Sequence, residues 1–166
     1  GLCLELAAAM LLLGNAVTDL EEGQELARKL ISSGVALEKF REMVEAQGGD
    51  PRCIDDFSLL PQAQWSEEVL AEQAGYVTAI DTQAVGLAAM HLGAGRRKLD
   101  TALDYSVGLQ IKAKVGDYVE KGQPLCTIYY NNPDFLEVTK KRLLQSYELG
   151  QECAELSVMV KEIIES

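Results

Sequence analysis

Residues 114–129 read KVGDYVEKGQPLCTIY, and this stretch decides the class of fold. Gly116 and Gly122 mark two turns, because glycine adopts the backbone conformations that tight turns require. Apolar residues alternate before the first turn, and an apolar run at 124–130 follows the second. The alternating residues are Leu109, Ile111, Ala113 and Val115. Such runs between glycine turns are typical of antiparallel strands, so we expect an α+β module here.

The same stretch raises the question of a covalently attached cofactor. Its VGDxVxKGQxL pattern resembles the β-hairpin of biotinyl and lipoyl domains, whose fold is of the barrel-sandwich type. Those domains attach the cofactor through a lysine on an exposed hairpin directly after the second strand. Here no lysine follows until Lys140, which falls inside a predicted helix. We therefore reject a carrier function and expect neither biotin nor lipoate.

Composition excludes several classes of protein. The chain has 166 residues, enough for one domain or a small domain with part of another, and a net charge of −11. This acidity argues against nucleic acid as a partner, because phosphate binding needs clustered lysine and arginine. Residues 2–13 fall short of the roughly 20 that a membrane-spanning helix needs, so we expect no membrane partner. Cysteines 3, 53, 126 and 153 show no paired spacing, which favours a reduced, cytoplasmic protein without a zinc site.

The first 50 residues are predicted to form three helices. Residues 2–13 are apolar on nearly every side, so the first helix needs packing partners in several directions. Residues 18–21 form a capping-box start for a second helix, and Leu37, Phe40 and Val44 line a third. The chain begins inside the first helix without an initiator methionine, so we interpret it as a fragment. If exposed, Leu4, Leu11 and Leu12 would favour non-native dimers.

The pattern changes after residue 50. Residues 51–68 lack periodicity and predict an extended linker, which Trp65 could anchor to a neighbouring surface. Apolar alternation on both sides of Gly75 then predicts two paired strands, and a helical stripe from Val85 to Leu92 ends at Gly93 and Gly95. A further helix starts at Asn132–Asp134 and is expected to end at Gly150. Its inward residues are Leu136, Leu143 and Tyr147, and a last strand is expected at Leu156, Val158 and Val160.

Few residues suggest chemistry. Residues Gly93–Lys98 join two glycines to three cations and could meet a phosphate, although a solvated basic turn after a helix is the favoured interpretation. His91 is the single histidine and is expected to be a packed or half-exposed helix residue. The acidic pairs at 21–22, 55–56 and 67–68 lack the spacing of a metal site and are expected to be solvated. We therefore predict no catalytic, cofactor-binding or metal-binding residue.

Four segments together resemble one enzyme family. They are AQGGDP at 46–51, GYVTAID at 75–81, LGAGR at 92–96 and KVGDYVEKGQPL at 114–125. The same segments occur in this order and at similar spacing in the pyrimidine-nucleoside phosphorylases and the related thymidine phosphorylases. The resemblance covers essentially the whole chain and identifies it with the C-terminal part of that family.

The resemblance implies a reaction and a division into domains. In the intact enzyme, phosphate attacks the anomeric carbon of uridine or thymidine and releases the base and a pentose 1-phosphate. A small helical domain carrying the base site and the dimer contact closes on a larger α/β domain. On this view residues 1–50 are a helical remnant of the α/β domain, residues 51–68 a linker, and residues 69–166 the C-terminal α+β domain.

The resemblance also implies what this chain lacks. The family's Lys-His-Ser-Thr-Gly-Gly phosphate loop, its base-reading helix and its potassium ligands map to no residue from Gly1 to Ser166. The chain is therefore expected to be inactive alone and to need the remainder of the parent enzyme, a homodimer that uses phosphate and holds potassium in some members. The alternative is a free-standing binding or assembly module built on the biotinyl-like hairpin.

Overall fold

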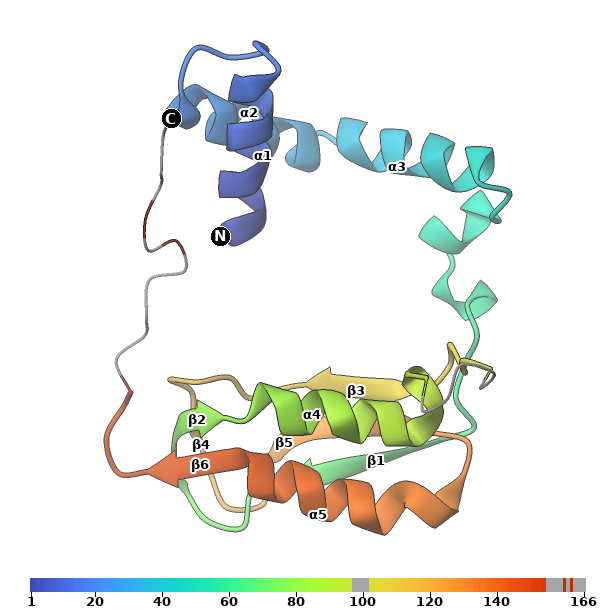
Figure 1. Cartoon of the computed structure of the whole chain (residues 1–166), viewed down its shortest axis with the longest axis vertical. Coiled ribbons are helices and arrows are strands. Elements are labelled where there is room, and N and C mark those ends of the chain that lie inside the picture. Colours follow the sequence, from blue (N-terminus) through green and yellow to red (C-terminus); the bar gives the residue numbers. More distant parts are fainter. Residues whose placement is uncertain (97–101, 155–159, 161, 163–166) are drawn as a thin grey trace. The chain divides into compact units, whose positions relative to one another are not determined.

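The computed structural model describes residues 1–96, 102–154, 160 and 162, and its chain divides into two compact units. Residues 1–59 belong to a helical unit and residues 60–154 to an α+β unit (Figure 1). Each unit is described by itself.

The helical unit contains the three helices that the sequence predicts. They are α1 (Leu2–Leu13), α2 (Leu20–Ser32) and α3 (Val35–Ala46). Asp19 caps α2 by accepting a hydrogen bond from the Glu22 amide, and the Glu22 carboxylate accepts from the amide and hydroxyl of Thr18. The reciprocal cap therefore starts one residue later than the predicted capping box.

Helix α1 packs closely on α2 and is otherwise poorly covered. Ala8 is fully buried, and a Cβ atom at Gly23 would lie 2.9 Å from the Cα of Ala8, so glycine is what allows this approach. The prediction of partners in several directions is not met among the described residues. The residues singled out for exposure, Leu4, Leu11 and Leu12, are only half-exposed. The exposed apolar residues of α1 are instead Leu2, Leu6, Met10 and Leu13.

Residues 51–68 do not form the extended linker that the sequence predicts. They contain two 3₁₀ helices, η1 (Pro51–Ile54) and η2 (Phe57–Leu59), and the first strand already begins at Trp65. Arg41 on α3 donates to both carboxylate oxygens of Asp55, at 2.9 and 3.0 Å, and to the Pro51 carbonyl at 3.2 Å. These contacts order the segment by fixing η1 to α3.

The α+β unit contains two three-stranded antiparallel sheets, which confirms the predicted fold class. The first has the order β1 (Trp65–Leu70), β5 (Pro124–Tyr130), β3 (Gly108–Ile111), and the second has the order β4 (Tyr118–Val119), β2 (Gly75–Ile80), β6 (Tyr147–Gly150). The expected pairing of β3 with β5 is present. The two strands around Gly75 do not pair, because β1 pairs with β5 while β2 pairs with β4 and β6.

Residues 114–129 do not form one simple hairpin. β4 and β5 lie on the two sides of Gly122 but belong to different sheets. Gly122 has φ +85°, its amide donates to the carbonyl of Ala71, and the Ala71 amide donates to Gln123. The chain thus crosses between sheets at this turn, and no closed barrel forms among the described strands.

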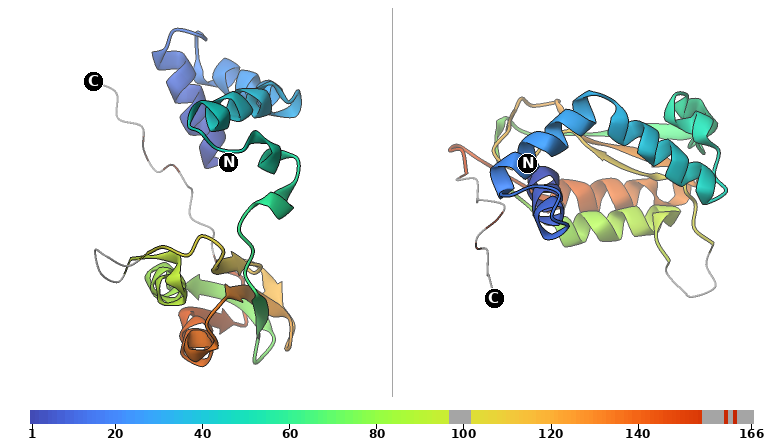
Figure 2. Two further views of the ribbon diagram at one scale, coloured as in Figure 1. Left: turned by 90° about the vertical axis from the view of Figure 1, so that its right-hand side faces the viewer. Right: turned by 90° about the horizontal axis from the view of Figure 1, so that it is seen from above.

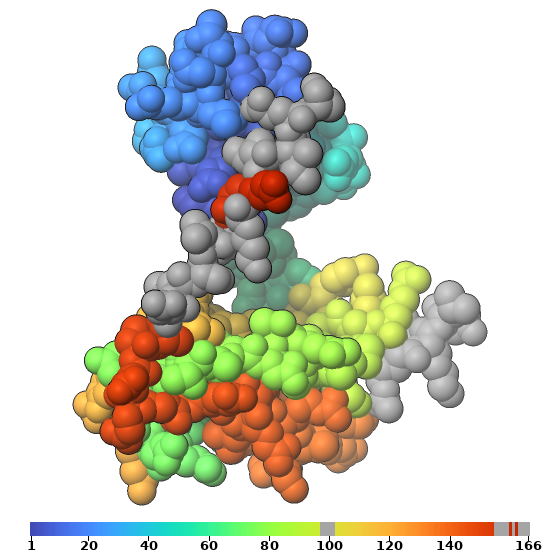
Figure 3. Space-filling view, turned by 60° about the vertical axis from the view of Figure 1, so that its left-hand side comes forward, coloured from blue at the N-terminus to red at the C-terminus, as the bar shows by residue number. Residues whose placement is uncertain are grey.

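Two helices complete the unit, and β5 connects two hydrophobic cores. Helices α4 (Thr82–Ala89) and α5 (Leu136–Ser146) run side by side, as Figure 2 and the green and orange surfaces of Figure 3 show. Ala88 and Leu143 from these helices pack with Cys126 and Ile128 of β5. In the second core, Leu125 of β5 packs with residues that include Ala71, Val77, Ala113, Val119 and Tyr147.

The last helix is shorter at both ends than the sequence predicts. Asn132 caps a 3₁₀ turn, η4 (Pro133–Phe135), and α5 follows from Leu136. The helix stops at Ser146, because Tyr147 is extended and begins β6, while Leu143 and Tyr147 are buried as predicted. Of the strand expected at 156–160, Leu156 and Val158 lie outside the described residues, and Val160 is not in a strand.

Candidate functional site

The glycines after α4 end the helix as the sequence predicts. Residues Met90–Ala94 form a π-helical turn in which Gly93 has φ +112°, a conformation that glycine adopts without strain. A Cβ at Gly95 would lie 2.8 Å from the Cγ of Met90, so this position also requires a small residue. Arg96 is exposed, and Arg97 and Lys98 of the predicted basic turn lie outside the described residues.

His91 is held as a structural residue of this turn. Its Nδ1 lies 2.7 Å from the Leu87 carbonyl and 3.4 Å from Nη1 of Arg142. A carbonyl can only accept, so Nδ1 carries the proton and donates to Leu87. Within the described part of the chain, His91 makes no hydrogen bond to a serine, cysteine or carboxylate. Its intermediate burial matches the predicted half-exposed helix residue.

A polar cluster beside this turn was not predicted from the sequence. It consists of Gln64, Asp104, Ser106 and Asn131. The Asn131 amide nitrogen donates to Asp104 Oδ2 and Ser106 Oγ, both at 2.8 Å, and its oxygen accepts from the Gln64 amide at 2.7 Å. The hydroxyl of Ser106 donates to Asp104 Oδ1 at 2.6 Å.

The cluster connects segments that are far apart in the sequence. Gln64 precedes β1, Asp104 and Ser106 precede β3, and Asn131 follows β5. The Asp104 amide also donates to the Gly93 carbonyl at 3.0 Å, which ties the cluster to the glycine turn. Hydrogen bonds from Ser106 and then Asn131 lower the pKa of Asp104, so its carboxylate is the charged acceptor at the centre. A short Asp-x-Ser turn was the only local sign of it.

Two lysines of the α+β unit form ion pairs with β1. Lys140 lies within α5, as predicted, and its Nζ is 2.8 Å from Glu67 Oε1 on β1. Lys112 pairs in the same way with Glu68 at 2.7 Å. The acidic pair at 67–68 is therefore not simply solvated, and Asp55 likewise pairs with Arg41.

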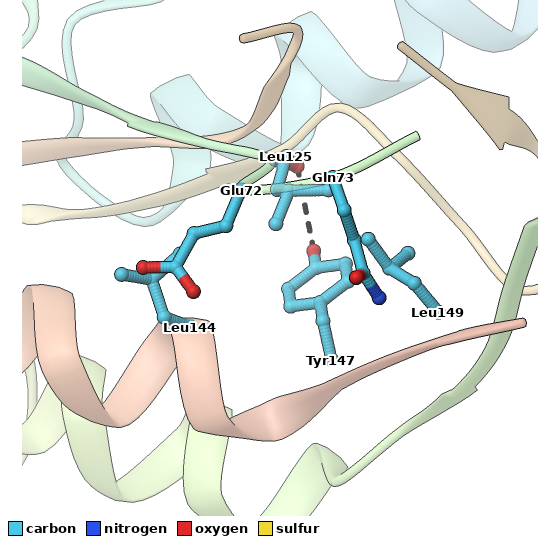
Figure 4. A pocket seen from close by; sticks show the side chains of 6 residues that line it. All are labelled: Glu72, Gln73, Leu125, Leu144, Tyr147 and Leu149. Carbon is cyan, nitrogen blue, oxygen red and sulfur yellow. Dashed lines mark hydrogen bonds between the residues drawn. The ribbon is translucent and has the colours of Figure 1, made fainter. Parts of the chain in front are cut away.

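A small pocket lies between the second core and the surface of the α+β unit (Figure 4). It has a volume of about 210 Å³ and is lined by Glu72, Gln73, Leu125, Leu144, Tyr147 and Leu149. The Tyr147 hydroxyl lies 3.3 Å from the Ala113 carbonyl and 3.4 Å from that of Leu125, and burial raises its pKa to about 12. The phenol is thus neutral, and the volume is below the roughly 300–1,000 Å³ of typical ligand sites.

The described residues do not bring together metal ligands or a membrane span. Among residues 1–96, 102–154, 160 and 162, no three histidine, cysteine or acidic side chains are grouped as a metal site would require. In the same part of the chain, every helix is too short or too polar to cross a membrane.

Comparison with known proteins finds one matching domain and several similar enzymes. Residues 76–150 match the pyrimidine nucleoside phosphorylase C-terminal domain. The pyrimidine-nucleoside phosphorylase of Geobacillus stearothermophilus is 44% identical over 140 residues, which cover 84% of this chain and 32% of the relative. The pyrimidine-nucleoside phosphorylase of Staphylococcus aureus strain USA300 is 43% identical over 140 residues, which again cover 84% of this chain and 32% of the relative. The chain thus spans about a third of the length of these relatives, and its residues 76–150 carry the C-terminal domain found in pyrimidine nucleoside phosphorylases.

Proposed function

We propose that this chain is the C-terminal part of a pyrimidine-nucleoside phosphorylase. The identity of 44% over 140 residues to the Geobacillus enzyme supports this proposal most strongly. In the reaction, a phosphate oxygen bonds to the anomeric carbon of a uridine- or thymidine-type nucleoside. The carbon–nitrogen bond breaks, the base leaves with the electron pair and takes up a proton, and a pentose 1-phosphate remains.

In this proposal the chain alone is not catalytic. Phosphorolysis needs a phosphate held in line with the glycosidic carbon and stabilisation of the charge on the departing base. Among the described residues, three polar groups that could contribute are held in structural contacts: His91 binds the Leu87 carbonyl, Asp104 binds Ser106 and Asn131, and Lys140 binds Glu67. The chain would contribute support and packing surface to an active site built elsewhere in the enzyme.

The proposal extends to organisation and partners. Residues 1–50 are a remnant of the phosphate-binding α/β domain, residues 51–68 connect it, and residues 69–166 form the C-terminal domain, whose hairpin is related to the barrel-sandwich type. The partner is the remainder of the parent enzyme, a cytoplasmic homodimer with inorganic phosphate as co-substrate and potassium as an optional ion of the parent.

The test is phosphate-dependent release of uracil and thymine from uridine and thymidine. One sample is this chain alone, and the other is a chimera in which the chain replaces the matched segment of the Geobacillus enzyme. We expect turnover by the chimera only. Turnover by the chain alone would overturn its assignment as non-catalytic, and a folded but inactive chimera would count against the phosphorylase assignment.

A further inference from the structure

The small pocket of the α+β unit combines apolar walls with a polar mouth (Figure 4). Its walls come from three elements: Leu125 on β5 is buried, and Leu144 on α5 and Leu149 on β6 are half-buried. The ring of Tyr147 lies between them, and its hydroxyl is directed at two main-chain carbonyls, 3.3 and 3.4 Å away. The ring is therefore the part of Tyr147 that can contact a ligand.

The mouth of the pocket carries a carboxylate that the fold leaves free. Glu72 and Gln73 lie in the turn between β1 and β2 and are exposed, and Figure 4 shows their side chains on either side of the Tyr147 ring. Within residues 1–96, 102–154, 160 and 162, neither side chain forms a hydrogen bond or an ion pair. Glu67 and Glu68, a few residues earlier on β1, each have a lysine partner. The Glu72 carboxylate is thus available to a ligand.

We propose that this pocket binds a small organic cation, namely a primary alkylammonium ion. Its volume of about 210 Å³ exceeds the roughly 150 Å³ of an engineered cavity that holds benzene, so an ion of about six non-hydrogen atoms fits. The leucines would contact the alkyl chain, and the carboxylate of Glu72 and the amide oxygen of Gln73 would accept from the ammonium group. The face of the Tyr147 ring also attracts a cation. This site goes beyond the proposed function.

The same pocket disfavours other classes of ligand. An anion such as phosphate would meet the charge of Glu72 in a chain whose net charge is −11. A neutral apolar ligand could fill the walls but would cover the carboxylate without offering it a donor, which carries a desolvation cost. A calcium ion takes six to eight oxygen ligands, and Glu72 is the single carboxylate among the described lining residues. A cation with an apolar body satisfies both parts of the pocket.

The test is a titration of the whole 166-residue chain with isoamylammonium chloride, followed by amide NMR. Isoamyl alcohol, which has the same shape without the charge, is the comparison ligand. We expect saturable shifts of the Leu125, Leu144 and Leu149 amides with the ammonium ion. The alcohol should bind at least about threefold more weakly, as expected for the loss of an exposed ion pair. Binding of the ammonium ion, but not of the alcohol, should weaken between about 20 mM and about 500 mM sodium chloride.

Three substitutions at exposed positions locate the interaction. Glu72→Gln should reduce the affinity for the ammonium ion to that for the alcohol, whereas Gln73→Glu adds a second carboxylate at the mouth and should increase it. Glu148→Gln is the matched control, because it removes the same charge from an exposed position on β6. Glu148 lies between Tyr147 and Leu149, so its side chain points to the opposite face of the strand, and its substitution should leave binding unchanged.

Several results would overturn the proposal. They are an alcohol that binds as tightly as the ammonium ion, an absence of shifts at the three leucine amides, and a Glu72→Gln variant with wild-type affinity. Equal losses in Glu72→Gln and Glu148→Gln would assign the attraction to the net charge of the chain and would also overturn the site. Comparison of the two ligands uses the unmodified chain, so it decides even if a variant fails to fold. None of these measurements depends on phosphorolysis, so failure of this proposal leaves the proposed function untouched.

Discussion

The two units bury their apolar side chains to very different extents. The α+β unit has two cores that contain fully buried residues such as Val77, Ile128 and Leu143. Among the described residues of the helical unit, the buried hydrophobic side chains are small, namely Ala8, Val17 and Ala27, while Met10 and Leu13 are exposed. Because burial of apolar area is the main favourable term in folding, the core of the α+β unit is expected to contribute more stability than that of the helical unit.

The largest effect is expected from truncating the core of the α+β unit. Leu143→Ala removes a fully buried side chain and should lower the free energy of unfolding by about 2–5 kcal/mol. Leu13→Ala, at an exposed position, should change it by no more than about 0.5 kcal/mol. Urea denaturation followed by circular dichroism measures both. Equal effects of the two substitutions would remove the contrast between the units.

A second comparison uses two helical glycines. In Gly23→Ala the new methyl group would lie 2.9 Å from the Ala8 backbone, and overpacking typically costs about 1–3 kcal/mol. Gly86 on α4 has no atom within 4 Å of such a methyl group, so Gly86→Ala should stabilise the chain by about 0.5–1 kcal/mol. Thermal melts should shift in opposite directions. A stabilising Gly23→Ala would show that α1 and α2 are not held together as described.

The polar cluster gives a smaller effect. Asn131→Ala removes three hydrogen bonds and leaves the Gln64 amide and Asp104 with fewer partners. We expect a loss of about 1–3 kcal/mol in the unfolding of the α+β unit, since unsatisfied polar groups carry a desolvation cost. Gln110→Ala, which removes a single exposed contact with Tyr129, is the control and should be nearly neutral. An Asn131→Ala variant as stable as the control would show that the cluster is not stabilising.

Local signals in the sequence predicted the elements better than their pairing. Alternation and glycine turns located β2, β3 and β5, and helical spacing located α1 to α4, because these signals depend on neighbouring residues. The pairing of β1 with β5 depends on contacts about 60 residues apart, and the pattern around Gly75 equally allows a hairpin. The end of α5 was missed because no glycine or proline marks Ser146, where pairing of Tyr147 with Ile80 overrides the helical pattern.

The polar cluster was missed for the same reason. Gln64, Asp104, Ser106 and Asn131 are common loop residues, and only the paths of β1, β3 and β5 bring them together. The family, in contrast, was recognisable from four short segments, three of which overlap the matched domain at 76–150. Recognition needs only similarity of sequence, whereas a cluster of this kind needs the three-dimensional arrangement.

The smallest expected effect is a pH dependence that arises from Asp104. Its pKa is lowered in the folded chain, so its stabilising contribution is present above the ordinary aspartate pKa of 3.8 and is lost as the pH falls through the lower folded value. In Asp104→Asn this contribution is absent at every pH. The difference in unfolding free energy between the wild type and Asp104→Asn should therefore be largest above pH 5 and should shrink below pH 4. Asp56→Asn in the helical unit is a second case, because Ser58 lowers the pKa of that exposed carboxyl and a dependence of the same sign is expected there. A wild-type advantage that stays constant from pH 3 to pH 6 would mean that the Asp104 charge does not stabilise the cluster, and that its hydrogen bonds alone link the glycine turn to the sheet.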